Sequence, residues 1–162
     1  MGGLTACTYP VRTCMFSALN RLFRREEAPK KLFVDAVLGQ FTFERDLGWK
    51  ARLALGGRQA ELVLGSDGES PSAEMLRTAK SWLEQWPSQH PRIIEYIRRE
   101  LASWSDEPNL PVPDKLEVDS INLLWSDKPT TSMIYFHYPG DDIRAWHVTF
   151  EGFEPQGFAY DD

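Results

Sequence analysis

The chain has 162 residues, of which 42% are hydrophobic and 26% charged, and its 24 acidic and 18 basic side chains give a net charge of −6. This length is typical of one domain, and the composition is that of a folded protein rather than a disordered one. No apolar run reaches the roughly 18 residues that a membrane-spanning helix requires, so we predict no transmembrane segment.

The charge is divided unevenly along the chain. Residues 1–31 carry six basic and two acidic side chains, whereas residues 32–162 carry 12 basic and 22 acidic ones. We therefore predict a basic leader, 1–31, that is disordered or a short helix, followed by a single domain, 32–162. An acidic domain lacks the basic face that neutralises phosphates, which argues against nucleic acid as a partner. Complementary charge favours a basic protein partner instead, although an acidic surface also serves solubility alone.

The leader contains both cysteines, Cys7 and Cys14, so no disulfide can brace the domain, and we expect a reducing, cytoplasmic compartment. Only three residues precede Leu4–Cys7, which is too few for a lipoprotein signal. Met15 is an alternative start, and the basic amphipathic stretch that follows it is either a frayed leading helix or a contact with an anionic membrane surface.

The strongest local pattern is a β-hairpin. Two alternating runs, Trp49–Leu55 and Arg58–Leu64, flank Gly56-Gly57, and a two-glycine turn suits the positive φ angles of a tight hairpin. The turn fixes a register in which Arg52 lies opposite Glu61, a favourable cross-strand charge pair. An earlier strand is predicted at Phe41 and Phe43, which alternate with polar residues.

Two helices are expected next. Ser70 as N-cap and Pro71 at the first position would begin one helix, and Pro87 would end it. Pro91 would begin a second helix, so the short link between them predicts a helical hairpin. The predicted inner faces are Met75, Ala79, Trp82, Leu83 and Trp86 in the first helix and Ile94, Ile97, Leu101 and Trp104 in the second.

A Pro-, Asp- and Asn-rich loop, 105–114, precedes a second group of strands. These strands are expected at Leu116–Trp125, Ser132–Tyr138, Arg144–Phe150 and Gly157–Tyr160. Helices segregated from hairpins predict the α+β class rather than alternating βαβ units. The expected architecture is a twisted antiparallel sheet, from an N-terminal hairpin and C-terminal strands, with a two-helix pair packed on one face.

No catalytic centre is apparent in the sequence. There is no Gly-x-Ser-x-Gly nucleophile motif, no phosphate-binding loop and no cysteine near a histidine, so we predict no cofactor and no catalytic residues. His137 and His147 lie in neighbouring predicted strands, and with Asp141 or Asp142 they are the candidate ligands for a metal ion. Their spacing matches no metal-binding signature, and a surface or satisfied core role is the alternative.

The C-terminal stretch combines acidic and aromatic residues. Aromatic side chains supply binding hot spots, and acidic ones steer the approach of a basic partner. This stretch is therefore the candidate partner-binding surface, although strand alternation would equally place its aromatic residues in the core. The candidate residues are Asp141, Asp142, Trp146, Glu151, Phe153 and Glu154.

Several structural motifs of the body resemble those of a group of small bacterial α+β domains. They are Leu38-Gly39-Gln40-Phe41, Trp49, the strand Ala60–Leu64, Ile134-Tyr135-Phe136 and Phe150-Glu151-Gly152. The group includes immunity-type proteins of toxin systems, so the resemblance implies a basic partner such as a toxin. It assigns no functional residue.

These observations favour a non-enzymatic, cytoplasmic protein-binding domain of immunity-like or regulatory type. The alternative is a small-molecule-binding domain or an enzyme with its site between the sheet and loop 105–114, which would require a cleft with converging polar groups. A membrane-associated protein, attached through the basic leader, is the third hypothesis.

Overall fold

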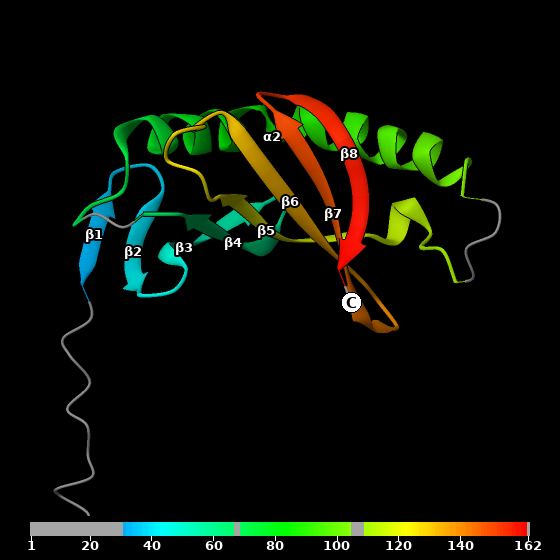
Figure 1. The fold of residues 1–162 in the computed structure, drawn as a ribbon, viewed down its shortest axis with the longest axis horizontal. Coiled ribbons are helices and arrows are strands. Elements are labelled where there is room, and N and C mark those ends of the chain that lie inside the picture. The colour runs from blue at the N-terminus through cyan, green and yellow to red at the C-terminus, as the bar shows by residue number, and fades with distance from the viewer. Residues whose placement is uncertain (1–30, 67–68, 105–108, 162) are drawn as a thin grey trace, which may run out of the picture. The chain divides into compact units, whose positions relative to one another are not determined.

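The computed structural model describes residues 31–66, 69–104 and 109–161. The predicted leader except for Lys31, both cysteines and the amphipathic stretch after Met15 lie outside the described residues. The described residues form an eight-stranded sheet, which Figure 1 shows together with a long helix. The elements are β1 (Leu32–Asp35), β2 (Gly39–Glu44), β3 (Gly48–Leu55), β4 (Arg58–Leu64), α2 (Ala73–Leu101), the 3-10 turn η1 (Pro113–Lys115), β5 (Glu117–Leu123), β6 (Thr131–Tyr138), β7 (Asp141–Glu151) and β8 (Glu154–Asp161).

The strands lie side by side in the order in which they occur in the chain. Strands β1–β4 form one antiparallel meander and β5–β8 a second. The meanders join through β4 and β5, which pair in parallel, so the chain must cross over between them. α2 lies in that crossover, because parallel neighbours need a long connection.

The predicted two-helix fold is wrong: the domain is dominated by its sheet and has a single α-helix within the described ranges. Pro87 and Pro91 lie inside α2 instead of ending one helix and starting another. Both are exposed and four residues apart, so they share the solvent-facing side. The carbonyl groups that lose their helical partners there can bind water, which makes the prolines tolerable.

The start of α2 also differs from the prediction. Ser72, not Ser70, is the N-cap, and its Oγ accepts a hydrogen bond from the Glu74 amide at 3.3 Å. In the ranges that the structure describes, no helix combines the length and the apolarity needed to cross a membrane.

The predicted hairpin is confirmed. β3 and β4 pair with Trp49 opposite Leu64 and Leu55 opposite Arg58, and Gly56 and Gly57 have φ angles of +57° and +85°. Arg52 lies opposite Glu61 as expected, but the Glu61 carboxylate lies 2.9 Å from the ammonium group of Lys50 on the same strand as Arg52. That contact raises the pKa of Lys50 above its ordinary value.

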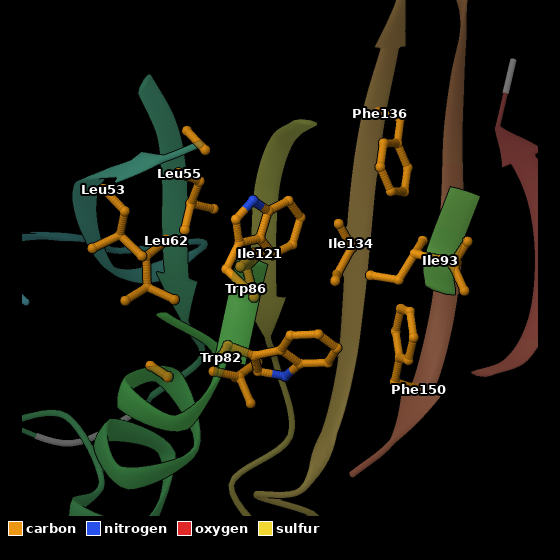
Figure 2. Packing of buried hydrophobic residues seen from close by; sticks show 14 of the residues in the cluster. Leu53, Leu55, Leu62, Trp82, Trp86, Ile93, Ile121, Ile134, Phe136 and Phe150 are labelled. Carbon is orange, nitrogen blue, oxygen red and sulfur yellow. The ribbon is translucent and has the colours of Figure 1, made fainter. Parts of the chain in front are cut away.

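The core lies between α2 and one face of the sheet. Figure 2 shows Trp82, Trp86 and Ile93 of the helix beside side chains of both meanders. The Trp82 ring meets the Phe150 ring edge-on at 5.0 Å between centroids. The buried helical positions continue in one stripe through both prolines: Met75, Ala79, Trp82, Trp86, Gln89, Ile93, Ile94, Ile97 and Leu101.

Candidate functional site

Two register shifts flank β6 near one end of the second meander. On one side, β5 has an extra residue, Asp119, between Val118 and Ser120. On the other side, the pairing of β6 with β7 shifts between Phe136 and Tyr138. Such bulges break the ladder and re-aim side chains, and they occur often beside functional sites.

The bulges border a hollow of about 300 Å³, which we call the acidic hollow. Its charged side chains are Asp119, Asp141, Asp142 and Arg144, so acids outnumber bases by three to one. The remaining residues of the hollow include an aromatic ring and a histidine. The full lining is Asp119, Tyr135, Phe136, His137, Asp141, Asp142, Ile143, Arg144 and Ala145.

The Asp141 carboxylate makes its contacts within its own strand, β7. Its Oδ1 accepts hydrogen bonds from the amides of Ile143 and Arg144, at 3.3 and 3.2 Å, and its Oδ2 lies 3.9 Å from Arg144 Nε. These contacts fix the irregular start of β7. Asp119 and Asp142 are exposed, and neither forms an ion pair within the described ranges. They are therefore the two carboxylates of the acidic hollow that are open to an incoming cation.

Arg144 is turned toward the aromatic residues at the end of the sheet. Its guanidinium lies 5.6 Å from the Trp146 ring and 5.1 Å from the Tyr160 ring, within cation–π range. It also donates a hydrogen bond to the Asn109 carbonyl at 3.3 Å. These contacts keep the one basic side chain of the lining partly buried.

A polar cluster borders the acidic hollow on the sheet face opposite α2. The Tyr135 hydroxyl donates to Asp161 Oδ2 at 3.3 Å, and His147 Nδ1 lies 3.6 Å from the same oxygen. The Tyr135 and His147 rings are 5.1 Å apart. Burial raises the pKa of Tyr135, and the adjacent Asp161 carboxylate raises it further. Tyr135 is thus a neutral, aromatic wall shared by this cluster and the acidic hollow.

The predicted partner-binding residues do not form one patch. Asp141 and Asp142 begin β7 at the acidic hollow, whereas Glu151 ends β7 and Glu154 begins β8 at the opposite end of the strand. Trp146 has none of its surface exposed and packs in the core.

At the opposite end of β7, Glu151, Phe153 and Glu154 contact other residues of the domain. The Glu151 carboxylate accepts hydrogen bonds from the hydroxyls of Thr130 and Thr131, at 2.6 and 2.8 Å, and these bonds lower its pKa. Phe153 is half-buried, with its ring 4.7 Å from the Trp82 ring, and Glu154 lies 3.8 Å from Arg92. A partner there would have to displace internal contacts.

The two candidate metal-binding histidines take different places. His137 is exposed and lines the acidic hollow, whereas His147 is 9% exposed and lies beside Asp161. Among the described residues, no group of three or more His, Cys, Asp or Glu side chains is arranged to hold a metal ion. Sequence reasoning missed Asp119 and Tyr135 because a bulge has no sequence signature at this position.

The alternative site beside loop 105–114 corresponds to a second hollow, of about 250 Å³, between α2, the β3–β4 turn and η1. Three of the charged side chains that line this hollow form ion pairs: Arg58 pairs with Glu117, and Asp114 lies 3.0 Å from Arg98. His90 is part of this lining, and it lies within α2 rather than in a loop between helices. Burial lowers the pKa of His90.

A third hollow, of about 550 Å³, lies along the first half of α2 and the β7–β8 turn, and its charged lining comes from the helix. Two acidic and two basic side chains line it: Glu74, Arg77, Lys80 and Glu84. It therefore has no preferred sign of charge.

Comparison of the whole chain with protein-family models, with curated proteins and with solved structures finds no match.

Proposed function

We propose that this protein is a non-enzymatic binding domain that receives a lysine or arginine side chain of a basic protein partner in the acidic hollow. The observation that carries the proposal is the pair of exposed carboxylates, Asp119 and Asp142, that the two bulges present on either side of β6. Tyr135 lines the same hollow and offers an aromatic ring, on which a cation binds favourably.

The charge of the surrounding chain supports the same partner. Residues 109–161 carry nine acidic and three basic side chains, whereas residues 31–66 are close to balanced with four and five. The resulting field would attract a basic surface toward the second meander and orient it there. A toxin enzyme of the kind implied by the resemblance to immunity-type proteins would meet this requirement, and its neutralisation would be the biological role.

The direct test uses a short arginine-rich peptide as the probe. Isotope-labelled full-length protein is titrated with the peptide, and backbone amide shifts are followed by NMR. We expect the largest shifts at residues 119, 135 and 142, and a weaker interaction at high salt because exposed charges are screened. A glutamate-rich peptide of the same length is the control ligand.

The matched variants remove two charges each. Asp119→Asn/Asp142→Asn should weaken peptide binding by about tenfold, or about 1.4 kcal/mol. Glu69→Gln/Glu84→Gln, two exposed acids outside the acidic hollow, should leave it within about twofold. Equal weakening by both pairs would show that only net charge matters and would contradict the assignment. Co-expression with the product of a neighbouring gene, scored by growth, then tests the toxin hypothesis separately.

A further inference from the structure

The first strand of the sheet presents an open edge. β1 pairs with β2 on one side, and within the described residues no strand pairs with its other side. Leu32 and Val34 are 60% and 71% exposed, so the edge strand carries two apolar side chains on one solvent-facing side. Exposed edges normally carry charges, prolines or bulges that prevent pairing, and Leu32–Val34 carries none of these.

The same two residues also present the unused backbone groups. The Phe43 amide donates to the Lys31 carbonyl, and Leu32 lies opposite Thr42. Because hydrogen-bonded and non-bonded pairs alternate in an antiparallel ladder, residues 31, 33 and 35 bond to β2, and the N–H and C=O groups of Leu32 and Val34 point outward. The edge thus offers two donors and two acceptors beside two apolar side chains.

We infer that this edge pairs with the β1 edge of a second copy of the chain, in antiparallel register about Phe33. In that register Leu32 lies opposite Val34 of the second copy, so each outward amide meets an outward carbonyl and the exposed aliphatic side chains cover one another. Lys31 falls opposite Asp35 of the second copy, whose carboxylate is already bound to Lys80 at 2.8 Å, so no like charges face one another in this register. The segment is therefore complementary to itself, which selects a second copy as the occupant.

The length of β1 limits the expected affinity of the proposed dimer. Four residues per strand bury far less than the area of a stable, standard interface, so the dimer should be a weak one. We expect a dissociation constant of roughly tens to hundreds of micromolar.

Sedimentation of the full-length protein over a concentration series tests this inference. We expect the mass to rise from monomer to dimer, and the amides of Leu32 and Val34 to become protected from hydrogen exchange as the concentration rises. Val34→Pro removes an outward N–H that the monomer does not use, and it should weaken association by at least about tenfold. Val34→Lys, which places a charge on the same apolar face, should do the same.

Val112→Lys is the control, because Val112 is 44% exposed and lies directly before η1, outside both the β1 edge and the acidic hollow. It should associate like the unmodified protein, and circular dichroism should show all three variants folded. A mass that stays monomeric up to about 1 mM would overturn the inference. So would an unchanged dimer in Val34→Pro, or concentration-independent protection of the Leu32 amide, which would place another segment of the same chain on the edge.

Discussion

The Asp35 carboxylate lies 2.8 Å from the Lys80 ammonium group, and this contact fastens the β1–β2 turn to α2. The same carboxylate organises the turn, because its Oδ1 accepts hydrogen bonds from the Val37 and Leu38 amides at 2.9 and 3.0 Å. Its side chain is 11% exposed. One residue therefore links the edge of the sheet to the only α-helix of the described ranges.

Asp35→Asn should destabilise the protein by about 2 kcal/mol at pH 7. The contact with Lys80, followed by the backbone hydrogen bonds, lowers the pKa of Asp35 from 3.8 to about 2. A carboxyl group whose pKa is lower in the folded state stabilises the protein fully above pH 3.8, and this contribution is lost as the pH falls toward 2. Urea denaturation at several pH values should show the two proteins converging near pH 2. Asp142→Asn, at an exposed acid, is the control and should change the free energy of unfolding little. If the difference in stability between Asp35→Asn and the unmodified protein were the same at every pH, the role assigned to the Asp35 carboxylate would be contradicted.

The stability of the protein should decrease as the pH falls through about 6.5, with a contribution from His90. Burial lowers the pKa of His90 in the folded state, so the unfolded chain takes up this proton first. Protonation then favours unfolding, and the loss levels off below the lowered pKa. His90→Gln should flatten the dependence of the denaturation midpoint on pH between about 5 and 7. Identical slopes for both proteins would show that His90 does not contribute.

Pro87→Ala should stabilise the protein by about 1–2 kcal/mol. Alanine at this exposed position restores an N–H that can bond to the Leu83 carbonyl within α2 and relieves the clash of the proline ring. The urea midpoint should rise at an unchanged denaturant slope. Pro139→Ala, in the exposed β6–β7 turn, is the control and should not stabilise. A lower midpoint for Pro87→Ala would mean that the sheet requires the proline geometry of the helix.

Gly65→Ala should destabilise the protein by about 3 kcal/mol. A Cβ atom at residue 65 would lie 2.2 Å from the Leu124 carbonyl oxygen, and backbone atoms cannot move away as a flexible side chain can. Gly65 also donates a 2.7 Å hydrogen bond to the Leu123 carbonyl, at the join between the two meanders. Gly157→Ala is the control, because a Cβ there meets nothing within 4 Å. Equal melting temperatures for Gly65→Ala and the unmodified protein would contradict the close packing of Gly65 against Leu124.

Local patterns in the sequence predict the elements that depend on neighbouring residues. The Gly56-Gly57 turn predicts the β3–β4 register because turn and alternation act over a few residues. The two-helix prediction is wrong because Pro87 is a local signal for the end of a helix, whereas the apolar stripe from Trp82 to Ile97 keeps its helical period through that position. Tertiary burial of that stripe outweighs the cost of the prolines.

Features that depend on pairing between distant segments could not be predicted in this way. The parallel contact of β4 with β5 joins residues such as Leu62 and Ile121, and no local pattern encodes it. The acidic hollow arises from bulges at Asp119 and at the start of β7, so its members come together only once three strands are aligned. Of the predicted site residues, His137, Asp141 and Asp142 lie in it, because they flank the same β6–β7 turn.

Because the strands lie side by side in chain order, strands that are far apart along the chain are also far apart across the sheet. The β1 edge therefore lies in the first meander and the acidic hollow in the second, and the two share no residue. A dimer joined through β1 would keep both of its hollows open and separated by both first meanders. Such a dimer would be bivalent, so two modest contacts with a partner that displays repeated basic side chains would combine into much tighter binding without any new contact.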